Sequence, residues 1–310
     1  MYDAANVAAC LTEHRGNICD VTALRAVVEE FQPEFVFHLA AQSIVREGYR
    51  EPVETYATNV VGTASLLDAC RKTSSVRAVV VVTSDKCYEN NNWVWGYRES
   101  DRLGGFDPYS SSKACAELVS DAFRRSYFTN SSRSAGIATA RAGNVIGGGD
   151  WAVDRLVPDL VRAMAAGRSA VIRNPGAVRP WQHVLDPLWG YLLLALELAD
   201  DASGFSGSWN FGPSADSMAT VESVVIRLAN QWKGRLKWSV DDSDHPHEAA
   251  RLVLDSSKAT AALHWRPLLD LDDALRLSAD WYEACLRKDV DWFSLSASQI
   301  ASYTKLTDRC

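Results

Sequence analysis

Three short runs in the first half of the chain carry apolar residues at both odd and even positions. They occupy residues 35–39, 78–82 and 136–140. A strand inside a parallel sheet is covered on both faces, so its sequence lacks the polar alternation of a half-exposed strand. The pattern therefore predicts three buried strands.

Longer segments with helical spacing separate these runs. Residues 22–31 place apolar side chains on one helical face before Pro33 ends the pattern. Residues 58–71 and 108–127 are expected to form two further helices. Strands that alternate with helices predict an α/β fold with a Rossmann-like, doubly wound parallel sheet.

The pattern changes from about Asp150 onward. Trp, Pro and Arg are dense over residues 151–189, and helices are expected at 188–198 and 218–232 with glycine-containing loops between them. We therefore predict two parts. Residues 1–150 form the Rossmann-like domain, and residues 151–310 mainly form a smaller mixed lobe with some segments returning to the sheet.

Composition narrows the possible functions. With 310 residues, of which 47% are hydrophobic and 23% charged, the chain can bury a large core. A formal net charge of -7 without any Lys/Arg-rich run argues against a nucleic-acid partner. The apolar stretch 191–198 contains Glu197 and is too short to span a bilayer, so we expect no membrane partner.

The cysteines and the first residues indicate the cellular compartment of the protein. The seven cysteines are scattered, with no C-x-x-C pair, which fits a reducing compartment. Residues 1–5 do not resemble the start of a secretory signal. A soluble cytoplasmic protein is expected. No metal site is expected either, because Pro246 separates His245 from His247 and no cysteine lies nearby.

Candidate chemistry follows the second predicted strand. Thr83, Ser84, Asp85 and Lys86 come directly after its valines, and Ser84, Asp85 and Asn144 fall at the carboxyl ends of strands, where ligands of such sheets bind. Tyr109 and Lys113 are spaced to share one face of a helix. The lysine's positive charge is expected to lower the tyrosine's pKa from about 10. Tyr109 would then be a general base at neutral pH.

A familiar motif is missing from the first residues. Dinucleotide-binding folds place a glycine-rich turn between their first strand and first helix, where it approaches the pyrophosphate. The first glycine here is Gly16, which stands alone. Two interpretations remain open: the protein uses no such cofactor, or the chain begins after that strand, turn and helix.

Several motifs together resemble the extended short-chain dehydrogenases/reductases that modify nucleotide sugars. These are residues 37–41 (Phe-His-Leu-Ala-Ala), 58–63 (Thr-Asn-Val-Val-Gly-Thr), 83–88 (Thr-Ser-Asp-Lys-Cys-Tyr), 109–113 (Tyr-Ser-Ser-Ser-Lys) and 141–147 (Arg-Ala-Gly-Asn-Val-Ile-Gly). Within that family, residues 84–90, 93–99, 147–151 and 179–184 look like the CDP-glucose 4,6-dehydratases. The resemblance runs from about residue 5 to the region of Trp281. Family members begin with a further segment that holds the glycine turn.

The resemblance implies a reaction and a role for each catalytic residue. NAD would accept hydride as C4 of CDP-glucose is oxidised, water would leave across C5 and C6, and hydride would return to C6. Tyr109, helped by Lys113, would take the C4 hydroxyl proton, and Ser84 would bind the same oxygen. Lys86 would take the C5 proton while Asp85 protonates the departing hydroxyl. These roles require a partly neutral lysine and a protonated aspartate, which burial promotes.

The resemblance also implies binding residues. The cofactor would contact Tyr109 and Lys113 together with Ile18, Ala40, Ala41, Thr58 and Thr83. Arg155 and Arg179 would hold the substrate pyrophosphate, for which guanidinium groups are well suited. Asn144 and Asn210 would contact the sugar and phosphate. A homodimer would form through the helices at 58–71 and 108–127.

Two alternatives stay open. One is another nucleotide-sugar dehydratase or epimerase of the same fold, in which an epimerase would tolerate Lys86→Ala. The other is an inactive truncated chain that serves only as a binding or dimerisation module, which the missing glycine turn suggests.

Overall fold

A four-stranded parallel sheet forms the centre of the molecule. The computed structural model describes residues 2–128, 135–241, 243, 251–287 and 290–308. The sheet order is β1 (Phe35–His38), β2 (Ala78–Val82), β3 (Gly136–Arg141) and β8 (Gly207–Asn210). The three predicted strands and the parallel α/β fold are thus confirmed. The fourth strand comes from the second half of the chain.

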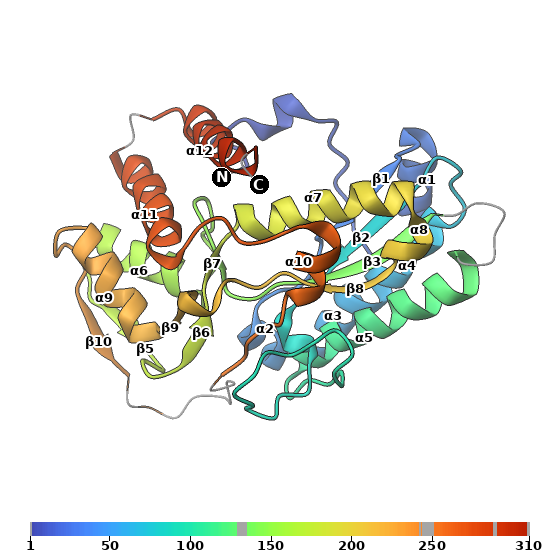
Figure 1. Ribbon diagram of the computed structural model, residues 1–310. Coiled ribbons are helices and arrows are strands. Elements are labelled where there is room, and N and C mark those ends of the chain that lie inside the picture. Colours follow the sequence, from blue (N-terminus) through green and yellow to red (C-terminus); the bar gives the residue numbers. More distant parts are fainter. Residues whose placement is uncertain (1, 129–134, 242, 244–250, 288–289, 309–310) are drawn as a thin grey trace.

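Helices cover both faces of this sheet (Figure 1). On one face lie α1 (Val21–Phe31), α4 (Gly62–Cys70) and α5 (Pro108–Phe123), and on the other lie α7 (Leu185–Asp200), α8 (Ala202–Phe205) and α10 (Ser257–Leu263). Val79 and Val81 pack with α4, whereas Ala78 and Val80 pack with α7. Both faces of β2 are therefore buried, which explains its unbroken run of apolar residues.

Two predicted helices differ from the expectation. The segment predicted at 58–71 consists of a π-helical turn (Ala57–Val61) and α4, and two short helices precede it, α2 (Val45–Arg50) and α3 (Pro52–Tyr56). The helix predicted at 218–232 begins only after a strand, β9 (Met218–Thr220), because the Thr220 side chain caps α9 (Val221–Gln231) by accepting a hydrogen bond from the Ser223 amide. The helix α5 continues into a second π turn, Arg124–Phe128.

The smaller lobe has its own apolar core, whose buried members run from Ile146 to Cys285. It contains α6 (Leu156–Ala165), α9 and α11 (Leu271–Arg287), with α12 (Trp292–Thr307) following. Three small two-stranded sheets lie among its described residues. They pair β4 (Val145–Ile146) with β7 (Gln182–His183), β5 (Ala170–Ile172) with β10 (Trp238–Val240), and β6 (Val178–Pro180) with β9.

The remaining helical elements are short. They are the 3-10 turns Val7–Cys10, Asp85–Cys87 and Ala215–Ser217. Within the described ranges no helix is long and apolar enough to cross a membrane. His245 and His247 lie outside the described residues.

Candidate active site

The candidate site begins where β2 ends. The Thr83 amide donates to the Ala140 carbonyl, and the Asp85 amide donates to the Ala142 carbonyl, so the chain stays attached to β3 beyond the strand. Ser84 then caps a 3-10 turn, Asp85–Cys87, by accepting a hydrogen bond of 3.2 Å from the Lys86 amide. This turn and its capping residue together carry three of the predicted catalytic side chains, Ser84, Asp85 and Lys86.

The N-terminus of α5 brings a second set of side chains to the same place. Asp107 caps the helix by accepting a 3.0 Å hydrogen bond from the Ser110 amide, and Pro108 occupies the first turn. Tyr109 therefore sits at the helix start. Gly48 of α2 packs closely against it, because a Cβ there would lie 3.1 Å from the Tyr109 nitrogen.

Ser84, Asp85, Lys86 and Tyr109 form one cluster. Ser84 and Tyr109 share a hydrogen bond. The Ser84 hydroxyl donates to Asp85 Oδ1 over 3.0 Å, and Lys86 Nζ lies 3.4 Å from the same oxygen. Asp85 is fully buried, and Ser84 and Tyr109 are buried as well. The site thus combines a phenol, a carboxyl group and an amine in surroundings that strengthen electrostatic interactions.

The pKa of Tyr109 is shifted upward, in the direction opposite to the one predicted. Burial raises it above the usual value of 10.0, and the charge of Lys86 and the hydrogen bond with Ser84 only partly oppose that shift. Lys113 instead donates to the Val82 carbonyl over 3.2 Å, and burial lowers its pKa to about 8. The prediction that Lys113 draws the tyrosine's pKa down is therefore wrong for this state, and the charge of Lys86 is the largest contribution that opposes the rise.

Lys86 also departs from the expectation. Burial lowers its pKa, but the negative charges of Asp85 and Tyr109 outweigh burial, so the net direction is upward. The predicted partly neutral lysine is thus wrong for the resting protein, since the ion pair with Asp85 holds the ammonium form. Lys86 would have to lose its proton during the reaction cycle rather than before it.

A loop after β3 closes one side of the cluster. A Cβ at Gly143 would lie only 2.0 Å from Asp85 Oδ2, so the glycine allows the carboxylate its position. Next to it, Asn144 adopts a positive φ of 47°. Asp85 Oδ2 and Asn144 Nδ2 are buried without a hydrogen-bond partner among the described residues. Such atoms are rare in folded proteins and suit contacts with a ligand.

Both predicted phosphate-binding arginines lie near the cluster. The charge of Arg155 partly opposes the rise in the pKa of Tyr109, and that of Arg179 partly opposes the rise in the pKa of Lys86. Arg155 is fixed by hydrogen bonds to Asp150 Oδ2 at 3.0 Å and to the Ser43 hydroxyl at 2.7 Å. It therefore connects the lobe with the loop that follows β1.

Asn210 has a different environment from the one expected for a substrate contact. It is fully buried at the end of β8. Its amide nitrogen donates to the carbonyls of Tyr97 and Asp255, and its amide oxygen accepts a 2.8 Å hydrogen bond from the Tyr88 hydroxyl. The side chain is thus engaged within the protein, and this argues against direct substrate binding.

The predicted cofactor residues border the carboxyl end of the sheet. Ala40 and Ala41 follow β1, with Ala40 exposed, and Thr58 hydrogen-bonds Glu54 over 3.3 Å. Ile18 packs against Gly62, where a Cβ would lie 2.6 Å from the isoleucine.

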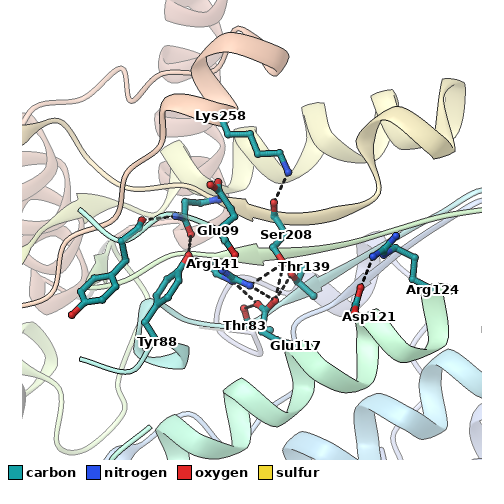
Figure 2. Close-up of polar contacts among 12 residues, drawn as sticks. Thr83, Tyr88, Glu99, Glu117, Asp121, Arg124, Thr139, Arg141, Ser208 and Lys258 are labelled. Carbon is teal, nitrogen blue, oxygen red and sulfur yellow. Dashed lines mark hydrogen bonds and ion pairs between the residues drawn. The ribbon is translucent and has the colours of Figure 1, made fainter. Parts of the chain in front are cut away.

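Thr83 is the exception among the predicted cofactor residues. Its hydroxyl is buried and donates to Glu117 Oε1. Glu117 lies one turn after Lys113 on α5 and forms a buried ion pair with Arg141 of β3 (Figure 2). Sequence reasoning missed this pair, because only the folded structure brings α5 and β3 together.

The sheet and the serine, tyrosine and lysine at its carboxyl end define the class of extended short-chain dehydrogenases/reductases. Comparisons with known proteins agree. The family model described as GDP-mannose 4,6 dehydratase matches residues 2–277. The chain therefore belongs to this dehydratase family, which confirms the predicted resemblance.

Individual relatives are consistent with that assignment. A CDP-glucose 4,6-dehydratase of Salmonella typhimurium is 45% identical over 100% of this chain and 87% of its own length. A dTDP-glucose 4,6-dehydratase of the same organism is 25% identical over 88% of this chain and 78% of its own length.

Solved structures share the fold. UDP-glucose 4-epimerase of Thermotoga maritima with UDP-glucose has a TM-score of 0.78 at 23% identity, over 88% of this chain and 84% of that one. A double mutant of the dTDP-glucose 4,6-dehydratase DesIV of Streptomyces venezuelae, with NAD bound, has a TM-score of 0.75 at 24% identity, over 94% of this chain and 85% of that one.

Proposed function

We propose that this protein is a CDP-glucose 4,6-dehydratase that produces CDP-4-keto-6-deoxyglucose. The observation that carries the proposal is the cluster in which a buried carboxyl group, tyrosine and serine lie beside the partly exposed amine of Lys86. Oxidation at C4 needs the tyrosine and serine, and elimination across C5 and C6 needs an acid and a base. The 45% identical relative of that name supports the choice of substrate.

Each side chain has one step in the proposed mechanism. Tyr109 takes the proton of the C4 hydroxyl, and Ser84, which already hydrogen-bonds Tyr109, binds the same sugar oxygen. Once C4 is a ketone, the C5 hydrogen is acidic. Lys86 passes its ammonium proton to Asp85 Oδ1, 3.4 Å away, and the neutral amine then removes the C5 hydrogen. Asp85, fully buried beside Lys86, protonates the departing C6 hydroxyl. The buried atoms of Asp85 and Asn144 that lack partners mark where the sugar would lie.

The side chains that border the sheet fit NAD as the cofactor. When bound, NAD accepts the hydride from C4 and returns it to C6. Lys113 uses one of its three N–H donors on the Val82 carbonyl, which leaves two for ribose hydroxyls. Ala40 and Ala41 leave space after β1, and Thr58 and Ile18 would border the adenosine side.

Arg155 and Arg179 would bind the substrate pyrophosphate. Both guanidinium groups act electrostatically on the catalytic cluster, so a substrate held between them would present its sugar to Tyr109 and Lys86. Their planar donors match phosphate oxygens in pairs. The anchoring of Arg155 through Asp150 and Ser43 would fix the direction of that contact.

A substitution at Lys86 tests the proposed function. The wild type with NAD should form a 4-keto-6-deoxy sugar from CDP-glucose, faster than from dTDP- or UDP-glucose. Lys86→Ala should lose that product by about 100-fold or more, because the C5 base is gone. Lys72→Ala, which removes a surface lysine paired with Asp68, is the matched control. If Lys86→Ala keeps its activity, or the wild type only epimerises its substrate, the proposal fails.

We further propose a homodimer that pairs through the predicted segments 58–71 and 108–127, which form the π turn Ala57–Val61, α4 and α5, with the neighbouring α3 at their edge. Helices α3 and α5 pack side by side, and they expose apolar side chains, namely Val53, Val61 of the adjoining π turn, and Leu118. Leu118→Asp should shift the sedimentation coefficient from that of two chains to that of one. Ile226→Asp on α9, another exposed apolar position, should leave it unchanged. A monomeric wild type would contradict this assembly.

A cytoplasmic location is proposed on the state of the cysteines. Six of them lie in the described part of the chain, and all six are free thiols, three of them buried. Free thiols persist in a reducing compartment.

A further inference from the structure

The Glu117–Arg141 ion pair is almost completely buried beneath the catalytic turn, and the mechanism does not use it. Each side chain is only 2% exposed. Arg141 Nη2 lies 2.7 Å from Glu117 Oε2, and Arg141 Nε donates to Glu117 Oε1 over 3.0 Å. The pair is therefore bidentate, the geometry in which arginine and carboxylate hold each other most firmly.

The ion pair reaches both ends of the catalytic turn. Thr83, directly before Ser84, donates its hydroxyl to Glu117 Oε1. Tyr88, directly after the turn Asp85–Cys87, accepts a 2.6 Å hydrogen bond from Arg141 Nη1. Figure 2 shows both contacts converging on the pair from the two sides. The four residues between Thr83 and Tyr88 include all three catalytic side chains that precede α5.

Stability alone does not account for this arrangement. The attraction within a buried ion pair only about offsets the free-energy cost of removing both charges from water. Apolar side chains of similar volume at the same place often give the protein equal stability. This pair forms hydrogen bonds at both ends of the catalytic turn, so its effect is to fix the position of that turn. Displacement of a catalytic group by about 1 Å lowers rates by about 100-fold.

We propose that Glu117 and Arg141 are positioning residues that clamp the catalytic turn at Thr83 and at Tyr88. The clamp holds Ser84, Asp85 and Lys86 at the distances that the reaction needs, while neither member of the pair touches substrate. This inference rests on the proposed function, since it concerns the same site.

Conservative variants of the two clamp contacts test the inference. Thr83→Val and Tyr88→Phe each remove one hydroxyl and leave the ion pair intact. Thr139→Val is the matched control, because Thr139 donates to Glu117 Oε2 over 2.6 Å but lies inside β3, away from the turn. The test does not use Glu117→Gln, which would break the ion pair itself, so it does not depend on whether that variant folds.

Measurement of kcat and KM for CDP-glucose distinguishes a clamp on the catalytic turn from a general structural role of the ion pair. Thr83→Val and Tyr88→Phe should lower kcat by about tenfold or more with KM within about twofold, because binding is kept while geometry is lost. Thr139→Val should have a similar loss in unfolding temperature but a kcat within about twofold of wild type. Equal kcat losses in all three variants, or a loss in only one of the two clamp variants, would overturn the proposal.

Hydrogen exchange gives a readout that does not depend on the substrate. The amides of residues 84–88 should exchange about fivefold faster in Thr83→Val and in Tyr88→Phe, but not in Thr139→Val. Unchanged exchange in both clamp variants would overturn the clamp. If the wild type does not act on CDP-glucose while the exchange pattern holds, only the proposed function fails.

Discussion

Tyr109 and Lys113 lie one helical turn apart, yet their side chains contact different neighbours. Tyr109 is joined to Ser84 and lies near Lys86, whereas Lys113 donates to the Val82 carbonyl. Burial moves their pKa values apart, because it raises that of the phenol above 10.0 and lowers that of the amine from 10.5 to about 8. His38 and Cys87 also face Lys113, and the lysine's charge helps burial to lower the pKa of His38 to about 4.

These shifts predict the pH dependence of kcat/KM. The active form needs an ionised Tyr109 and a protonated Lys113. Below about pH 8 the lysine is charged, so the rate should rise about tenfold per pH unit as more tyrosine ionises. Above about pH 8 the fraction of charged Lys113 falls about as steeply with pH as the fraction of ionised Tyr109 rises. The value of kcat/KM should therefore level.

Initial rates between pH 6 and pH 9 check this prediction. Lys113→Arg, whose guanidinium stays charged, is the control, and its rate should keep rising beyond the point where the wild type levels. A wild-type profile that is flat from pH 6 to pH 8 would show that Tyr109 is already ionised and would contradict the account.

At the scale of elements, the strands with two buried faces were the most predictable. Val79 and Val81 face one layer of helices and Ala78 and Val80 the other, so β2 has an unmistakable sequence. The strand β8 was missed because it is short and carries polar residues, and two of them, Ser208 and Asn210, are used by the buried network instead of facing water.

The candidate site also contains some residues that the sequence predicts and others that it does not. Ser84, Asp85, Lys86 and Tyr109 could be predicted, since their types and order along the chain already suggest the chemistry. The Glu117–Arg141 pair could not, because it joins α5 to β3 through a contact between residues 24 positions apart. Nor does sequence spacing reveal that burial, rather than Lys113, dominates the pKa of Tyr109.

The loop after β3 yields a second prediction. Gly143→Ala would place a methyl group 2.0 Å from Asp85 Oδ2, so the carboxylate must move. The kcat should fall by about 100-fold, because Asp85 would no longer lie beside the C6 hydroxyl. Gly176→Ala, where nothing lies within 4 Å of the added Cβ, is the control. Steady-state kinetics with a circular dichroism spectrum decide, and a Gly143→Ala variant with wild-type kcat would show that Asp85 has no such role.

At the scale of the molecule, Asp186 holds three parts of the chain together. It lies fully buried in α7, accepts hydrogen bonds from the Leu268 amide at 2.8 Å and from the Tyr303 hydroxyl of α12 at 2.9 Å, and is separated from water. Burial raises the pKa of its carboxyl group to about 6. The buried negative charge therefore makes the folded state less favourable at neutral pH than the contacts alone would suggest.

Asp186→Asn should be more stable than the wild type at pH 8. The folded state holds the proton up to about pH 6, whereas the unfolded carboxyl loses it near the usual value of 3.8, so wild-type stability falls as pH rises through this window. The variant avoids that loss, with an expected gain of about 1–3 kcal/mol at pH 8 and a smaller gain at pH 5.

Denaturant unfolding at both pH values measures the difference. Asp200→Asn, an exposed carboxylate at the end of the same helix, should change stability by no more than about 0.5 kcal/mol. A variant at Asp186 that is less stable at pH 8 would mean that the charge itself holds α12 in place.

The central claim is that this buried cluster removes the C5 proton and expels the C6 hydroxyl of CDP-glucose. Incubation of the protein with CDP-glucose and NAD in deuterated water, followed by NMR of the sugar, tests it most directly. The account predicts a 4-keto-6-deoxy sugar with deuterium at C5, because the proton that Lys86 removes exchanges with solvent before C5 is protonated again. A product that keeps its C6 hydroxyl, or one that forms without any deuterium at C5, would contradict it.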